Sequence, residues 1–346
     1  TANGTNIQVH KGNRTAAQKW CLESTTFGGK GWKTDNQTER RYYRDGTYLT
    51  GWQKLGNDYY YFYPETGCLA YKNDKGVSPV IDGYTFDTEG RRVLPKASDI
   101  LADVKPGGGT LLNMLQNALI PCGRVLYVWG GGWGNTDANK IGYLPSWGSF
   151  FNTHATPTYN RNDYRYAYGS GLDCSGYVSW VVYNANYKKN DQANILYGNG
   201  TSYNSTKLAQ RVSSLGFGTY NPGAIGSYTY LRPGDIVSMS GHVWIYLGSC
   251  PDGSGVILHS SPMGDTYGGG VQLAGTKNKA GSSDSDGYRL AKAYMEKYFS
   301  YWPYPTHTAG DDYRTSAVGY CRWRNDPDGL KKMSAAEVLE TILGKL

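Results

Sequence analysis

The sequence predicts an α+β domain preceded by a small all-β module of short hairpins. Three observations support this prediction: a self-similarity with a period of 20 residues near the amino terminus, a change of composition near Leu94, and mixed helix and strand patterns after it. The 346 residues also exceed the length at which one hydrophobic core usually stops growing, so two domains are expected. We place them at residues 1–96 and 97–346.

The self-similar segment comprises two copies and a degraded third. GWKTDNQTERRYYRDGTY begins at Gly31, GWQKLGNDYYYFYPETGC begins at Gly51, and IDGYTFDTEGRRV echoes the second copy with one residue lost before its glycine. Aromatic residues that alternate before a glycine-containing turn predict a hairpin in each copy. One hairpin cannot bury its aromatic face alone, so we expect the copies to stack on one another.

The Gly-Trp and Tyr-Tyr spacing of residues 31–93 resembles cell-wall-binding repeats of the choline-binding or glucan-binding type. In such repeats the aromatic residues of adjacent hairpins form shallow ligand sites. The resemblance implies a wall polymer, choline-bearing teichoic acid or glucan, as a partner. The residues expected to bind it are Trp32, Trp52, Tyr59, Tyr60 and Tyr61. A tyrosine-rich β-module without a ligand is the alternative.

Composition narrows the classes of partner. The formal net charge of +7 favours an anionic surface, but no block of consecutive Lys and Arg occurs, so nucleic acid is not expected. No apolar run is long enough for a membrane span. The chain opens on TANGTNIQVH, which lacks the regions of a signal peptide, so a cytosolic protein or a removed leader is expected. Six scattered cysteines without CxxC spacing predict neither a zinc ribbon nor a dense disulfide framework.

The second domain shows both helical and strand periodicity after a linker at 94–110. Apolar spacing predicts a helix from Leu111, and Ser334 with Glu337 forms a capping box before a carboxy-terminal helix. Strands are expected in DIVSM, HVWIYLG, GVILHS and AVGYCRW.

Cys174 stands in GLDCSGYVSW, where apolar residues fall on one face of a helix that begins after Asp173. Asp173 is the natural N-cap, which places the thiol in the first turn. The positive end of the helix dipole is expected to lower the pKa of that thiol. Taken alone, a cysteine in such a helix is more often a packed core residue than a nucleophile.

Two histidines follow on predicted strands. Alternation puts His242, Trp244 and Tyr246 on one face of HVWIYLG, with the aliphatic residues turned to the core. His242 is therefore expected to look out from a sheet surface that the cysteine helix covers, where it can hold a thiolate and protonate a leaving amine. His259 in GVILHSS is placed to orient the first imidazole.

The runs YVWGGG, DCSGYV and LRPGDIV…GHVWIYLG…VILHS resemble the NlpC/P60 cysteine peptidases in order and local sequence over residues 108–260. The resemblance implies a papain-like fold in which the cysteine helix packs on an antiparallel sheet. It also implies cleavage of peptidoglycan stem peptides, between D-glutamate and the diamino acid that follows. Cys174 would be the nucleophile, His242 the base and His259 the orienting residue.

Substrate contacts follow from the same resemblance. Tyr127 would help hold the substrate or its oxyanion, and Asp173 and Ser175 would receive the amine of the stem peptide. Trp129 and Trp244 are expected beside the substrate as well, and a long aromatic insertion at 133–170 is expected to border the groove. No metal or cofactor is predicted.

The sequence thus predicts a secreted, wall-associated hydrolase. Two alternatives stay open. One is an amidase of the related CHAP type, which cuts between sugar and peptide and whose third triad member is usually an acid or Asn. The other is a wall-binding or adhesion protein with an inactive peptidase-like domain.

Overall fold

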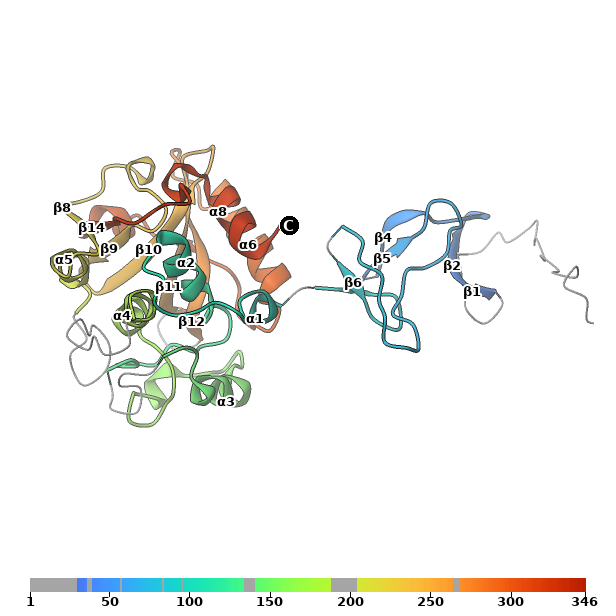
Figure 1. Ribbon diagram of the computed structural model, residues 1–346, viewed down its shortest axis with the longest axis horizontal. Coiled ribbons are helices and arrows are strands. Elements are labelled where there is room, and N and C mark those ends of the chain that lie inside the picture. The colour runs from blue at the N-terminus through green and yellow to red at the C-terminus, as the bar shows by residue number, and fades with distance from the viewer. Residues whose placement is uncertain are drawn as a thin grey trace, which may run out of the picture. The chain divides into compact units, whose positions relative to one another are not determined.

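A computed structural model describes residues 30–35, 39–56, 58–82, 84–94, 96–133, 141–187, 204–263 and 268–346. The chain divides into two units, Thr1–Leu94 and Pro95–Leu346, here called the hairpin unit and the sheet unit (Figure 1). Residues 1–29 of the predicted module and 134–140 of the predicted insertion lie outside the described residues.

Each copy of the repeat in the hairpin unit forms a small antiparallel sheet of its own. The first copy forms a three-stranded sheet, the second and third form one hairpin each, and the strands are β1 (Gly31–Asp35), β2 (Glu39–Arg44), β3 (Thr47–Tyr48), β4 (Gly51–Leu55), β5 (Asp58–Phe62), β6 (Thr85–Phe86) and β7 (Arg92–Val93). The predicted hairpins are therefore present. A small core of Tyr42, Phe62 and Leu69 joins the first two copies.

The sheet unit contains one large sheet whose neighbouring strands are antiparallel except for β12 and β13. Its order is β13-β12-β11-β10-β9-β14-β8. The strands are β8 (Gly218–Pro222), β9 (Ile236–Met239), β10 (His242–Ser249), β11 (Gly255–Pro262), β12 (Gly269–Thr276), β13 (Thr308–Ala309) and β14 (Ala317–Trp323). The four strands predicted from the sequence are β9, β10, β11 and β14, so the α+β class is confirmed.

The helices of the sheet unit include the two predicted at Leu111 and after Asp173. They are α1 (Ala97–Ile100), α2 (Leu111–Leu119), α3 (Pro145–His154), α4 (Cys174–Ala185), α5 (Leu208–Ser214), α6 (Asp286–Tyr298), α7 (Asp312–Thr315) and α8 (Ala335–Leu343), with short 3₁₀ helices η1 (Arg161–Asp163), η2 (Tyr228–Tyr230) and η3 (Leu330–Lys332). The capping box of Ser334 and Glu337 starts α8 as predicted.

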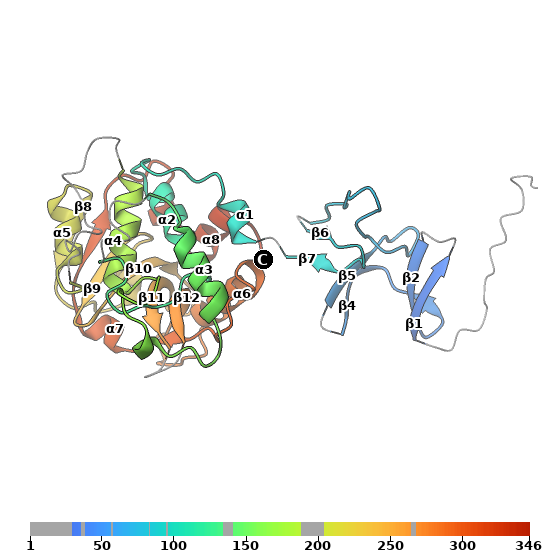
Figure 2. The ribbon, with the colours of Figure 1, turned by 90° about the horizontal axis from the view of Figure 1, so that it is seen from below.

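The sheet is buried on both faces. Its aliphatic side chains, such as Val243 and Ile245, pack with the long helices in the main core, and α4 lies against β10 and β11 (Figure 2). Trp244 and Tyr246 pack on the other face against Tyr228 of η2. The prediction that the cysteine helix covers the histidine face is therefore wrong, because α4 covers the aliphatic face.

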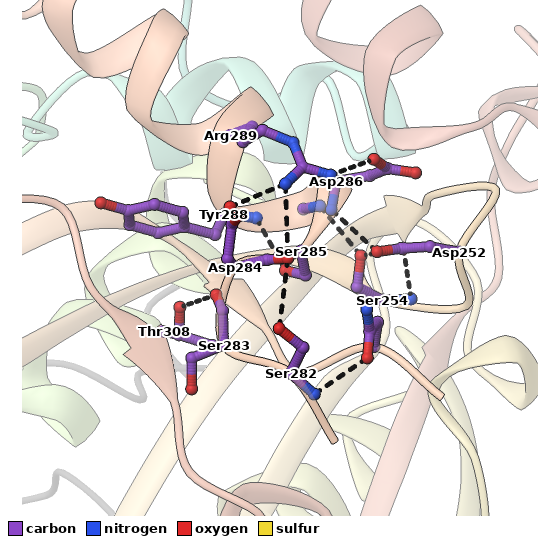
Figure 3. Close-up of polar contacts among 12 residues, drawn as sticks. Asp252, Ser254, Ser282, Ser283, Asp284, Ser285, Asp286, Tyr288, Arg289 and Thr308 are labelled. Carbon is purple, nitrogen blue, oxygen red and sulfur yellow. Dashed lines mark hydrogen bonds and ion pairs between the residues drawn. The ribbon is translucent and has the colours of Figure 1, made fainter. Parts of the chain in front are cut away.

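The start of α6 is fixed to the turn between β10 and β11 by a network of side chains (Figure 3). The carboxylate of Asp252 accepts a hydrogen bond from the backbone N–H of Asp286 at 2.8 Å, and the hydroxyl of Ser254 accepts one from Gly287 at 2.9 Å. Ser285 caps the same turn through the N–H of Tyr288. These contacts satisfy donors that the first turn of a helix otherwise leaves free.

Replacing Asp252 by alanine is expected to lower the free energy of unfolding by about 1–2 kcal/mol, because the N–H of Asp286 loses its acceptor. Denaturant unfolding of the full chain measures this loss. Asp284→Ala is the control, since Asp284 is an exposed partner of Arg289, and it should cost less than about 0.5 kcal/mol. Equal losses in the two variants would contradict the assignment.

Candidate active site

Cys174 is the first residue of α4, and Asp173 caps the helix as predicted. The Asp173 backbone is extended, and its carboxylate accepts a hydrogen bond from the N–H of Gly176 at 2.6 Å. A side chain at Gly176 would collide with the carbonyl oxygen of Gly131, so the YVWGGG run packs directly on the first turn. This packing fixes the position of the thiol at the helix start.

Asp173 and Ser175 are both buried, and their polar atoms are engaged within the chain. The second carboxylate oxygen of Asp173 accepts a hydrogen bond from the N–H of Gly130 at 3.1 Å. The hydroxyl of Ser175 donates to Asp173 and accepts from the indole N–H of Trp133. Burial raises the pKa of Asp173 to about 6, although its hydrogen bonds favour the charged form. Asp173 and Ser175, which were predicted to bind the stem-peptide amine, therefore connect the loop at Gly130 and Trp133 to the start of α4.

The sulfur of Cys174 lies beside the backbone at the start of β10. It is 4.0 Å from the carbonyl oxygen of Gly241 and within hydrogen-bonding reach of the backbone of Val243. These are the chain neighbours of His242, so the thiol lies at the start of the strand that carries the predicted base. Burial, followed by the charge of Asp173, raises the pKa of Cys174 to about 12. The predicted lowering is therefore wrong, because desolvation outweighs the helix dipole.

His242 and His259 form a direct hydrogen bond. Nε2 of His242 and Nδ1 of His259 are 3.0 Å apart, and the two rings meet nearly edge to face. One of the two nitrogens must donate and the other accept. A proton on Nε2 of His242 leaves Nδ1 of that ring unprotonated, which is the state a base needs.

Both imidazoles are held neutral by their surroundings. Burial lowers the pKa of His242 to about 3, and a positive charge on His307 would lower it further. The same two causes put the pKa of His259 well below its ordinary value. At neutral pH the thiol and both imidazoles are therefore uncharged.

Three further residues surround His259 that sequence patterns did not identify. The hydroxyl of Tyr313 on α7 is 3.4 Å from Nδ1 of His259, and the ring of His307 stacks on the His259 ring with centroids 5.1 Å apart. Gln272 pairs with His259 across β11 and β12 and is fully buried. No sequence pattern pairs His307 with another residue of the site. His307 directly precedes β13, and it reaches the site because β13 pairs in parallel with β12.

The other three residues predicted to contact the substrate, Tyr127, Trp129 and Trp244, differ in their exposure to solvent. Burial raises the pKa of Tyr127, and a negative charge on Cys174 or Asp173 would raise it further, which places the Tyr127 hydroxyl near the thiol. Trp129 is 63% exposed. The prediction that Trp244 contacts the substrate is wrong, because the side chain is fully buried on the face of the sheet that η2 and α7 cover. There its ring packs against those of Tyr228 and Tyr313.

The aromatic residues of the hairpin unit form two similar clusters. Trp32 contacts Tyr42 of its own hairpin and Tyr60 and Phe62 of the next. One copy later the same contacts recur, and this second cluster comprises Trp52, Tyr61, Tyr84 and Phe86. The predicted stacking of successive copies is thereby confirmed. Trp32 is 48% exposed and borders a cavity of about 330 Å³ with Tyr60, Arg40, Arg91, Glu89 and Thr34.

No protein-family model and no curated protein matches the chain. Among solved structures it is similar to choline-binding protein F in complex with ipratropium, with 28% identity and a TM-score of 0.16 over 19% of each chain. It is also similar to the choline-binding domain of Spr1274 of Streptococcus pneumoniae, with 24% identity and a TM-score of 0.17 over 20% of this chain and 98% of that one.

A further similarity is to choline-binding protein F of Streptococcus pneumoniae in the presence of a peptidoglycan analogue, with 28% identity and a TM-score of 0.16. That match covers 19% of this chain, which spans about a fifth of the length of choline-binding protein F. Within the described part of the chain, no helix has the length and apolar character needed to cross a bilayer.

Proposed function

We propose that the sheet unit is a cysteine endopeptidase that cleaves peptidoglycan stem peptides between D-glutamate and the diamino acid that follows. One observation supports the proposal above all: the thiol at the start of α4 lies beside the chain neighbours of His242, which is hydrogen-bonded to His259 at 3.0 Å. The choice of bond follows from the resemblance of residues 108–260 to the NlpC/P60 peptidases.

In this proposal the sulfur of Cys174 attacks the γ-carbonyl carbon of D-glutamate while Nδ1 of His242 takes the thiol proton. The backbone N–H of Cys174, at the helix start, and the hydroxyl of Tyr127 stabilise the oxyanion. Collapse breaks the C–N bond, and His242 returns the proton to the leaving amine. Water then hydrolyses the thioester with His242 as base, which releases the glutamyl carboxylate and restores the thiol.

The hairpin unit would bind a wall polymer, and exposed Trp32 beside Tyr60 supports this second role. The faces of aromatic rings attract cations, so the trimethylammonium group of choline is a suitable ligand. A secreted, wall-associated protein whose hairpin unit holds the sheet unit on its substrate would combine both roles.

Digestion of purified peptidoglycan separates the endopeptidase from its alternatives. Mass spectrometry of the fragments is expected to show new free amines on the diamino acid. Whole stem peptides released from the sugar would instead indicate a CHAP-type amidase. Unchanged peptidoglycan that still retains the protein would indicate an inactive wall-binding protein. The presence of His259, where CHAP amidases usually carry an acid or Asn, favours the endopeptidase.

A further inference from the structure

A cation of the hairpin unit lies against Trp52 and Tyr84 of the second aromatic cluster and against the ring of Tyr59. The guanidinium carbon of Arg92 lies 4.4 Å from the ring centroid of Tyr59, 4.7 Å from that of Tyr84 and 6.0 Å from that of Trp52. A cation within about 6 Å of a ring is attracted by the negative face of the π-system. We call the three rings the Arg92 cage.

The head group of Arg92 has no hydrogen-bond or ion-pair partner among the residues that the structure describes. Neighbouring arginines behave differently: Arg91 pairs with Asp87 at 2.9 Å, and Arg40 donates to the carbonyl of Thr88. A guanidinium carries five N–H donors and normally finds carboxylate or carbonyl acceptors. The aromatic rings alone therefore hold Arg92 in place.

The preceding copy of the repeat has an apolar residue at the same position. Arg92 pairs with Phe86 across the third hairpin, and Leu69 pairs with the equivalent Phe62. Leu69 is buried in the small core with Tyr42 and Phe62. Among the described residues, no cation lies over Trp32, Tyr42 or Tyr60, so the first cluster lacks an internal cation.

We propose that the Arg92 cage is a site for a quaternary ammonium cation, such as choline, that Arg92 closes from within. This inference rests on the proposed wall-binding role of the hairpin unit. Guanidinium and trimethylammonium groups compete for the same ring faces, and a tethered cation acts at an effective concentration in the millimolar range. Within the described part of the hairpin unit, the chain thus presents one open aromatic site, at Trp32 and Tyr60, and one site that opens when Arg92 leaves it.

Titration of the full chain with choline chloride tests the closure, with Trp32 and Trp52 observed separately by fluorine NMR of 5-fluorotryptophan. In the wild-type chain the signal of Trp32 is expected to shift and that of Trp52 to stay in place at the same choline concentration. In Arg92→Leu, which installs the residue of the preceding copy, both signals should shift. The half-saturating choline concentration at Trp52 should fall at least about tenfold.

Arg44→Leu removes the same charge from β2 without altering a cage and should behave as the wild type. A Trp52 signal that responds together with Trp32 in the wild-type chain would contradict the closure. So would an unresponsive Trp52 in Arg92→Leu when Trp32 still binds choline, which also shows that the variant is folded. No response at either tryptophan in any variant would overturn choline binding by the hairpin unit itself.

Discussion

Replacing Cys174 by alanine is expected to lower kcat/KM for stem-peptide cleavage by at least about 10⁴-fold. The substitution removes only the sulfur, which lies beside Gly241 and Val243 at the start of β10. Because α4 is capped by Asp173 and packed through its apolar face, the variant should fold as the wild type does. Initial rates with a synthetic stem peptide measure the loss.

Cys250→Ala is the matched control, because Cys250 is also a buried, unpaired cysteine but lies past the other end of β10. Cys250→Ala should change kcat/KM by less than about twofold, because Cys250 lies outside the proposed active site. His242→Ala should resemble Cys174→Ala, since the proposed mechanism uses the two residues together. A Cys174→Ala protein that cleaves as fast as Cys250→Ala would rule out the proposed nucleophile.

Acidification is expected to destabilise the sheet unit through its buried histidines. Burial lowers the pKa of His242 to about 3 and that of His307 to about 4, and it lowers that of His259 as well. Below the ordinary value of 6.5 the unfolded chain binds protons that the folded chain does not, so stability falls as the pH falls. At pH 4.5 His242 and His307 each cost about 2–3 kcal/mol relative to neutral pH.

Urea unfolding at pH 7.5 and pH 4.5 measures this loss. His259→Gln retains hydrogen-bonding capacity but does not titrate, so its loss between the two pH values should be smaller than that of the wild type. Identical losses in the two proteins would show that the cluster is not the acid-sensitive element.

Local patterns predicted the parts of the site that depend on neighbouring residues. The capping geometry of Asp173 placed Cys174 at a helix start, and alternation placed His242 and His259 on one face of adjacent strands. The burial of Trp244 and the approach of His307 and Tyr313 depend on which segments cover the far face of the sheet. Periodicity carries no information on such covering segments, so these features required the structure.

The pKa values illustrate the same limit. The helix dipole at Cys174 follows from sequence, but the desolvation that outweighs it depends on long-range packing by β10 and the loop before α4. In the hairpin unit, spacing identified the stacked aromatic residues. It did not show that Arg92 fills one cluster, because that contact depends on how the third hairpin folds back on Trp52.

The most direct measurement is the reaction of the purified full chain with a synthetic stem tetrapeptide, analysed by mass spectrometry beside Cys174→Ala. We expect the wild-type chain to release the alanyl-glutamate dipeptide together with a fragment that begins with the diamino acid. The Cys174→Ala chain should leave the tetrapeptide intact. An intact tetrapeptide after incubation with the wild-type chain, or equal cleavage by both proteins, would contradict the proposed peptidase.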